Sequence, residues 1–163
     1  MLTGREIVEN NLIGGYLEEN IQQVGVDLRV DEIFELSQIF ETPHFIPETG
    51  KTMVNFQKTP LNISTKGKEG IVLQPGYYEV RFMESCNLGS TFALDLKTRS
   101  SVVRCGGKVH NGMFDPGFNT ENMGCFLEIK YPIQLFHGSR IAQAIVFRCN
   151  NVDNMYNGQW QNS

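Results

Sequence analysis

The chain has 163 residues, 40% of them hydrophobic and 20% charged, with a formal net charge of −4. This balance predicts one soluble globular domain, residues 1–163, large enough for a single core. The acidic charge provides no basic field for a nucleic acid polymer, whose binding requires many phosphates to be neutralised. The sequence contains no apolar run of membrane-spanning length, and its first residues are too polar for a secretory signal. We therefore expect no membrane partner and a cytoplasmic protein, or one in the host cytoplasm if the source is a phage or virus.

The cysteine pattern argues against a zinc centre. A zinc-dependent nucleobase deaminase needs H-x-E followed by P-C-x-x-C to hold the metal and its water, and neither motif occurs here. The cysteines are scattered, without the spacing of a disulfide framework, and we expect all of them to be buried thiols. They are Cys86, Cys105, Cys125 and Cys149.

Many glycines and aromatic residues, 16 Gly and 11 Phe, indicate a mainly β protein with frequent turns. The exception is residues 2–12, whose apolar side chains recur at helical spacing. Thr3 and Glu6 predict a capping box at the start of this helix, and Gly14-Gly15 predicts its end. Residues 23–30 alternate apolar and polar side chains, as in a strand that directs Asp27 and Arg29 away from the core.

The middle of the chain predicts strands joined by long connections. Residues 31–58 contain short apolar pieces interrupted by prolines, as in two strands separated by a surface connection. Residues 59–70 are polar and lysine-rich, which predicts a solvated loop. Residues 71–84 read as a hairpin: a strand, a Pro-Gly turn and a second strand.

Residues 94–128 concentrate the polar chemistry among what look like consecutive short strands. Arg99-Ser100-Ser101 places a guanidinium beside two hydroxyls and the N–H groups of a strand end, an arrangement suited to a polyphosphate. Asp115 opens a Pro-Gly turn and Glu128 ends the following strand. The two carboxylates are thus predicted to face one pocket from opposite sides of a hairpin, where one of them can act as a general base.

This segment resembles the central signature of the dCTP deaminase and dUTPase superfamily, and most of all that of dCTP deaminase. The resemblance lies in the order, and largely in the spacing, of three motifs: R-S-S-V-V-R, F-D-P-G-F and F-L-E. The resemblance implies a dUTPase-like distorted β-barrel, jelly-roll-like, with a short N-terminal helix. It also implies a homotrimer with active sites shared between subunits, no metal in the deamination itself, and Mg²⁺ bound with the triphosphate. Ser100, Arg104 and Glu128 would surround the pyrimidine ring.

Other segments extend the resemblance. G-V-D-L-R resembles the first family motif, so Asp27 and Arg29 would support the site, and G-S-R-I-A-Q resembles a motif that places Gln143 near the nucleotide. Residues 150–163 resemble the tail that deaminases fold over the triphosphate, with Tyr156 and Gln159 closing the site. We expect this tail to be mobile without ligand. The glycine-rich arm with which dUTPases usually end is missing.

Two departures from the family pattern affect the site. The hairpin Cys105 to Phe114, which would read the pyrimidine edge, is shorter than in deaminases, and Asn111 replaces the usual Ala. His110, Asn111 and Gly112 are therefore substrate-binding candidates. Residues 119–123 form an insertion before the strand that carries Glu128.

The favoured function is hydrolytic deamination of dCTP at C4. Glu128 would be the general base, buried beside the uncharged pyrimidine. Ser100 and Arg104 would place the water and stabilise the charge that develops on the ring. The phosphate partners would be Arg99, Ser101 and Arg140, together with Mg²⁺. Two alternatives stay open. One is dUTP pyrophosphohydrolysis, alone or coupled to deamination, since G-M-F-D resembles a dUTPase motif in which Asp115 would orient the attacking water. The other is a non-catalytic nucleotide-binding regulator on the same fold.

Overall fold

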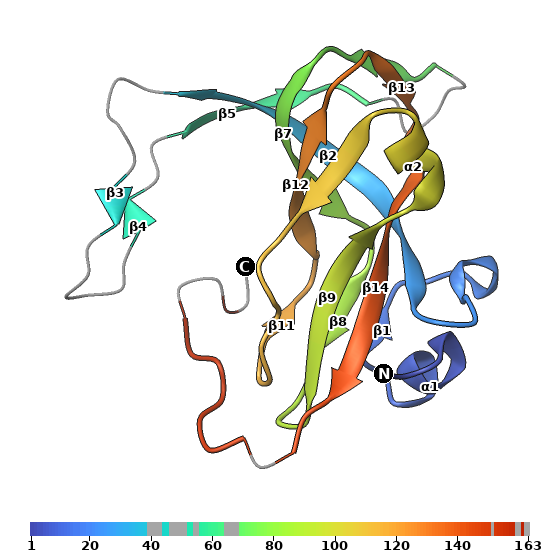
Figure 1. The fold of residues 1–163 in the computed structure, drawn as a ribbon, viewed down its shortest axis with the longest axis vertical. Helices are drawn as coiled ribbons and strands as arrows, with labels where there is room; N and C mark the ends of the chain where they lie inside the picture. Colours follow the sequence, from blue (N-terminus) through green and yellow to red (C-terminus); the bar gives the residue numbers. More distant parts are fainter. Residues whose placement is uncertain are drawn as a thin grey trace.

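The structure is a computed structural model that describes residues 1–38, 44–45, 52–53, 56–63, 69–150, 152–158 and 161. Short helical segments accompany an array of strands (Figure 1). The helical segments are α1 (Gly4–Glu9), η1 (Glu18–Asn20) and α2 (Ser100–Arg104). The strands are β1 (Ile13–Gly14), β2 (Val26–Gln38), β3 (His44–Phe45), β4 (Thr52–Met53), β5 (Phe56–Leu61), β6 (Ile71–Leu73), β7 (Gly76–Phe82), β8 (Ser85–Asn87), β9 (Phe92–Thr98), β10 (Gly107–His110), β11 (Asn119–Thr120), β12 (Gly124–Ile129), β13 (Ile133–Leu135) and β14 (Arg140–Arg148). The expectation of a mainly β protein is confirmed.

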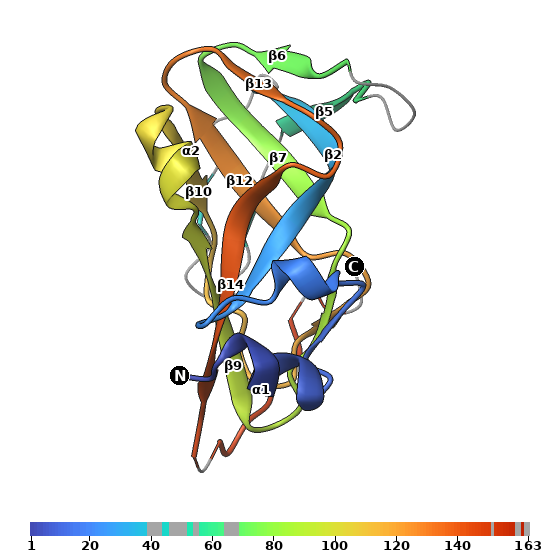
Figure 2. The same ribbon diagram turned by 90° about the vertical axis from the view of Figure 1, so that its right-hand side faces the viewer.

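One large antiparallel sheet organises the molecule, in the order β10-β12-β7-β2-β14-β9, with β5 also paired to β2. The long strand β2 makes this possible, because its first half pairs with β14 and its second half with β7 and β5. The sheet curls until its edge strands approach each other, and the Val109 amide of β10 donates to Thr98 Oγ1 of β9 at 2.9 Å. Figure 2 shows the resulting barrel-like wall from the side.

Three smaller sheets complete the fold: β1-β8-β11, β13-β6 and β3-β4. The core inside the curled sheet includes Leu28, Phe82, Leu94, Leu127 and Val146, each fully buried. No helix within the described residues has the length and apolar character needed to cross a membrane.

The N-terminal helix confirms its predicted capping box. Thr3 Oγ1 accepts from the Glu6 amide at 3.2 Å, and Glu6 Oε2 accepts from the Thr3 amide at 2.8 Å. The hydrogen bond from the Thr3 amide, and then one from the Thr3 hydroxyl to the same oxygen at 2.8 Å, lower the pKa of Glu6. The predicted helix end was wrong: α1 stops at Glu9 with Asn10 as its C-cap, because Asn11 already has a positive φ of 54°.

Three other local predictions were also wrong. Residues 71–84 do not form a hairpin, because β6 pairs with β13 while β7 lies between β12 and β2. The predicted loop at residues 59–70 begins inside β5, which pairs with β2 through Leu61. Of the four cysteines expected to be buried, Cys105 is exposed and Cys149 is intermediate. Burial raises the pKa of the Cys86 thiol to about 12.

Candidate functional site

The Arg-Ser-Ser segment starts a helix, not a further strand. β9 ends at Thr98, Arg99 occupies the N-cap with extended backbone, and α2 follows from Ser100 to Arg104. The helix turns the chain from β9 into β10, so its position is fixed by two strands of the large sheet. The side chains of Ser100, Ser101 and Arg104 are exposed, and solvent or a ligand can reach them.

A buried carboxylate organises two arginines beside this helix. The Asp27 side chain is 3% exposed, and its Oδ2 lies 3.2 Å from Arg99 Nε and 3.6 Å from Arg140 NH1. The side-chain Nε2 of Gln22 also donates to Oδ2 at 3.3 Å. Burial raises the pKa of Asp27, and the two guanidinium groups oppose that rise.

Asp27 lies on the strand face opposite its apolar neighbours, as predicted, and that face is buried at this point. Its neighbours come from distant parts of the chain, and Arg99 and Arg140 also donate to backbone carbonyls at 3.2 and 3.3 Å. Both arginine side chains remain about one third exposed, at 30% and 37%. Two oriented, accessible guanidiniums suit an anionic group with several oxygens, such as a phosphate.

A similar carboxylate supports the barrel at Glu84. This side chain is fully buried, accepts from the Arg29 amide at 2.8 Å and pairs with Arg29 Nε at 2.7 Å. Burial raises the pKa of Glu84, while the hydrogen bonds from Arg29 lower it. Arg29 is thus engaged within its own chain as a structural partner.

Glu128 lies on the outer face of β12 and pairs with His110 of β10. The distance from His110 Nε2 to Glu128 Oε2 is 2.8 Å. The Glu128 side chain is 56% exposed, so the burial expected of a general base is not present within one chain. Lys108 lies directly opposite Glu128 in the strand register.

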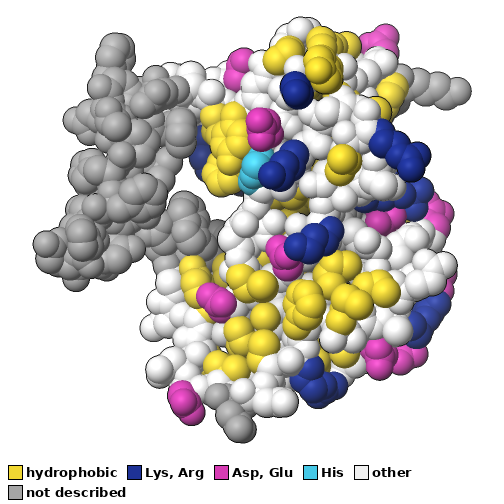
Figure 3. All heavy atoms as spheres, viewed as in Figure 1, with side chains coloured by type: hydrophobic (Ala, Val, Ile, Leu, Met, Phe, Trp, Pro, Cys, Tyr) yellow, Lys and Arg dark blue, Asp and Glu magenta, His cyan; other side chains and the backbone are white. Residues whose placement is uncertain are grey.

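Two aromatic rings border this pair. Tyr77 of β7 stacks on Phe126 of β12 at 5.3 Å with an interplanar angle of 9°. The Tyr77 ring also lies 5.9 Å from the His110 ring. Burial, and then the Glu128 charge, raise the pKa of Tyr77. Figure 3 shows hydrophobic side chains beside a histidine, a basic and an acidic side chain in the upper left of this face. We name Tyr77, Phe126 and His110 the aromatic ledge.

The loop after β10 carries the other candidate carboxylate. Asn111 donates to Asp95 Oδ1 at 3.1 Å and to the Gly112 carbonyl at 2.7 Å, so its amide group holds the loop. Asp115 is exposed at the start of its turn, and its carbonyl accepts from the Phe118 amide at 3.0 Å. No hydrogen bond or ion pair links Asp115 to Glu128, both of which are described. Whether they share a pocket stays a prediction.

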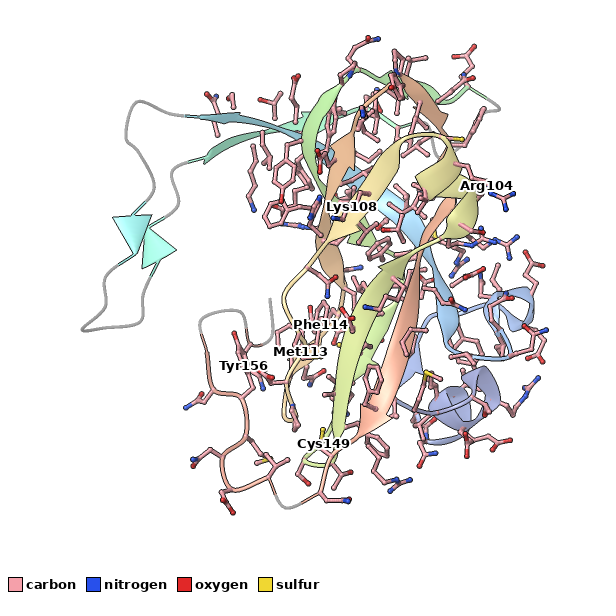
Figure 4. All side chains as sticks on the ribbon, viewed as in Figure 1. Arg104, Lys108, Met113, Phe114, Cys149 and Tyr156 are labelled. Atoms are coloured by element: carbon pink, nitrogen blue, oxygen red, sulfur yellow. The ribbon has the colours of Figure 1, made fainter. Side chains whose placement is uncertain are left out.

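The described part of the tail packs on this turn. The Tyr156 amide donates to the Pro116 carbonyl at 2.7 Å, and its ring meets Phe118 edge-on at 5.3 Å. Gln161 donates to the Gly117 carbonyl at 2.8 Å. Figure 4 shows Tyr156 near Met113 and Phe114. The tail thus has a docking place within its own chain, although we expected it to be mobile without ligand.

Of the two glutamines predicted to bind the nucleotide, Gln143 is described by the structure and Gln159 is not. The Gln143 side chain donates to the Val24 carbonyl, so it holds the chain just before β2. Gln159, predicted to close the site, lies outside the described residues.

The predicted site residues fall into two groups that share no hydrogen bond or ion pair. Neither Ser100 nor Arg104 makes a hydrogen bond or ion pair with Glu128 or His110, all four of which are described. Figure 4 places Arg104 at the right-hand side of α2 and Lys108, the neighbour of Glu128, farther left over β10. The first group is the arginine pair with α2, and the second is Glu128 with the aromatic ledge.

Sequence reasoning missed the two rings of Tyr77 and Phe126. A signal was present, because period-two alternation puts Phe126 on the same strand face as Glu128. Tyr77 needed the pairing of β7 with β12, which brings it opposite Glu128.

The described side chains contain no group of three or more His, Cys, Asp or Glu that could hold a metal ion. A Mg²⁺ ion takes oxygen ligands and usually keeps several waters while binding substrate phosphates, so a triphosphate-bound ion needs few protein ligands.

Comparisons with known proteins agree with this fold and with these motifs. Residues 3–149 match the family described as dCTP deaminase-like. A relative from Aeropyrum pernix, named probable deoxyuridine 5'-triphosphate nucleotidohydrolase, is 30% identical over 98% of this chain and 96% of its own. A relative from Streptomyces avermitilis, named dCTP deaminase, dUMP-forming, is 28% identical over 85% of this chain and 72% of its own.

The crystal structure of 2'-deoxycytidine 5'-triphosphate deaminase from Agrobacterium tumefaciens has the same fold, with a TM-score of 0.62 at 18% identity. The similarity covers 91% of this chain and 47% of that chain, so the present chain spans less than half of the Agrobacterium protein. The fold, the order of the motifs and the match over residues 3–149 together establish that this chain belongs to the dCTP deaminase-like family.

Proposed function

We propose that this protein is a hydrolase of pyrimidine deoxynucleoside triphosphates that deaminates dCTP at C4 in nucleotide metabolism. The observation that carries the proposal is the pairing of Glu128 with His110 on β12 and β10, in a chain that also presents Ser100 and Arg104 from α2. The relative from Streptomyces avermitilis, named for deamination of dCTP, supports this choice of reaction.

Glu128 is the general base of the proposed reaction. It takes a proton from water as the water oxygen bonds to C4, and it passes that proton to N3 of the ring. It then carries the proton of the new C4 hydroxyl to the amino group, as the C4–N bond breaks and the C4 carbonyl forms. Ammonia departs and the ring becomes uracil, so that dCTP and water give dUTP and ammonia. A carboxylate can act first as base and then as acid when it lies within hydrogen-bond reach of both groups.

The remaining residues bind and polarise the substrate. Ser100 and Arg104 would place the water and stabilise the charge that develops on the ring. The triphosphate would lie against Ser101, Arg99 and Arg140, the last two held by the buried carboxylate of Asp27. Mg²⁺ would neutralise the phosphate charge that the arginines leave. We place the protein in the cytoplasm, where deoxynucleotide precursors are made.

We further propose that the complete site forms between copies of the chain, in a homotrimer. The two groups of site residues share no hydrogen bond or ion pair within one chain, and the Glu128 side chain, 56% exposed, has no cover. A neighbouring subunit that brought α2 over the aromatic ledge would supply both missing features. A head-to-tail interface of this kind, repeated between identical chains, forms a closed ring when its rotation closes, as in the proposed homotrimer.

The second candidate function is release of pyrophosphate from dUTP to give dUMP. The name of the Aeropyrum pernix relative, which aligns over 98% of this chain, favours it. Asp115 would then orient the water that attacks phosphorus, and its exposed position leaves it free to do so. A protein with both activities would convert dCTP to dUMP.

Incubation with dCTP or with dUTP in the presence of Mg²⁺ separates these functions. Chromatography resolves dUTP from dUMP, and coupled assays measure ammonia and pyrophosphate. Ammonia from dCTP supports deamination, and pyrophosphate from dUTP supports the second candidate. Nucleotide binding without any product would contradict both and favour a regulator.

Replacement of each carboxylate assigns the roles. Glu128→Gln keeps the size of the side chain but cannot accept the proton, and ammonia release should fall by ~10²–10⁴-fold with binding retained. Asp115→Asn should instead stop pyrophosphate release. Circular dichroism must show that Asp115→Asn folds, because this residue also opens a turn.

A further inference from the structure

The contact between His110 and Glu128 runs diagonally between paired strands. The register sets His110 opposite Phe126, and Glu128 opposite Lys108. Diagonal neighbours on one face of a sheet lie ~7–8 Å apart, a distance that long or aromatic side chains can span. The imidazole spans it, with Nε2 at 2.8 Å from Oε2. Lys108, the direct neighbour, makes no ion pair with any described residue.

The imidazole of His110 is itself held in place. Its ring lies 5.9 Å from the Tyr77 ring at 54°, and Tyr77 stacks on Phe126. These contacts restrict the orientation of His110 before any substrate arrives. The His110 side chain is 34% exposed and that of Glu128 56% exposed, so their pairing adds little to folding stability.

We propose that His110 is a positioning residue for Glu128, an inference that rests on the proposed role of Glu128 as general base. An N–H at Nε2 donates to Oε2 and fixes the carboxylate, which leaves Oε1 to take the proton from water. His110 keeps its own proton and forms no bond to substrate. Without this partner, a half-exposed glutamate on a strand samples several side-chain conformations. A misplacement of 1 Å in a reacting group can cost up to ~10²-fold in rate.

Two replacements separate the hydrogen bond from the ring. His110→Gln keeps an N–H donor near the position of Nε2, whereas His110→Phe keeps the ring against Tyr77 but removes the donor. We expect His110→Phe to lower kcat for ammonia release from dCTP by ~10-fold or more, with KM within about twofold. His110→Gln should retain kcat within about threefold. If His110→Phe does not fold by circular dichroism, His110→Met, which has no donor, takes its place.

The same changes in a Glu128→Gln background show whether His110 acts through Glu128. The donor then has no carboxylate to orient, so His110→Phe should cause no further loss of the residual rate. Three results would each overturn the positioning role. The first is a parental kcat in His110→Phe, and the second is an equal loss of kcat in His110→Phe and His110→Gln. The third is a loss of kcat from His110→Phe that is as large in the Glu128→Gln background as in the parental protein. Those results leave the proposed function intact. Parental ammonia release by Glu128→Gln alone would overturn the general base, and the role of His110 with it.

Discussion

Asp27→Asn tests whether one buried carboxylate holds the two arginines of the candidate phosphate site. The replacement has nearly the same size, so no cavity forms and the change is electrostatic. It removes the single negative charge of a carboxylate whose Oδ2 lies 3.2 Å from Arg99 Nε and 3.6 Å from Arg140 NH1, and it replaces one carboxylate oxygen with an NH₂ group that cannot accept from either.

The expected loss of stability follows from these contacts. At an effective dielectric constant of ~20, each contact represents roughly 5 kcal/mol of gross attraction, which the desolvation of Asp27 largely offsets. Removal of one partner from a fully buried pair costs about 3–5 kcal/mol. The arginines here are 30% and 37% exposed and can regain water, so we expect a loss of about 2–3 kcal/mol in the free energy of unfolding.

Urea denaturation, followed by circular dichroism at one protein concentration, measures this loss. Glu32→Gln is the matched control, because Glu32 is 53% exposed and pairs with Arg81 at 3.4 Å. An exposed pair of this kind contributes at most about 1 kcal/mol. If Asp27→Asn lost no more stability than Glu32→Gln, the reasoning about the buried carboxylate would be refuted.

The affinity of Asp27→Asn for the triphosphate is a second measurement on the same variant. Its loss of charge and its loss of arginine orientation should change this affinity in opposite directions. The loss of a negative charge near the arginines would by itself tighten binding. The loss of their common anchor would weaken it. We expect orientation to dominate, with a Kd about threefold to tenfold higher, or roughly 1 kcal/mol. A lower Kd in Asp27→Asn would show that the arginines need no anchor.

Two further changes test the turn beneath the tail and the buried glutamate. Gly117→Ala should cost about 1–3 kcal/mol and release the tail, because Gly117 has a φ of +94° and an added Cβ would lie 2.8 Å from Met155 Cβ. Hydrogen exchange should quicken at residues 153–158, with Gly112→Ala, which faces open space, as control. Burial raises the pKa of Glu84 above its value of 4.5, so its contribution to stability is complete below pH 4.5 and is lost as the pH rises through the raised pKa. Glu84→Gln should remove that decline from the unfolding free energy measured against pH, and an unchanged profile would assign the decline to other groups.

The sequence predicted local structure correctly where that structure depends on residues close together in the chain. Thr3 and Glu6 are three residues apart, and their capping box forms as predicted. α2 was missed because Val102 and Val103 favour strands, and five residues are too few for helical periodicity to show.

Long-range pairing accounts for the other errors. Pro75-Gly76 suggested a hairpin, yet Leu73 pairs with Ile133, far along the chain. The period-two pattern correctly put Asp27 on the opposite face from its apolar neighbours. No local pattern could show that Arg99 and Arg140 cover that face, since their approach depends on how the whole sheet curls. The residue types at the site were therefore predictable, whereas their partners were not.

A site built from residues of two neighbouring chains can be restored by mixing two inactive variants, whereas a site within one chain cannot. Glu128→Gln removes the base from one group, and Arg104→Ala removes the guanidinium from the other. Each variant alone should be inactive. If the proposed trimer forms, a mixed trimer contains junctions between an intact Glu128 and an intact Arg104, and each such junction should restore one complete site.

Random mixing of equal amounts of the two variants should restore about a quarter of the parental activity, since each residue is intact in half of the subunits. Subunits must be exchanged by refolding together, and two affinity tags would confirm that mixed assemblies formed. A mixture of Glu128→Gln with unmutated chains gives the reference for dilution. Mixed assemblies that stayed inactive would show that Arg104 and Glu128 serve the same copy of the site from one chain. In that case the separation of α2 from the aromatic ledge would have to close within a single subunit.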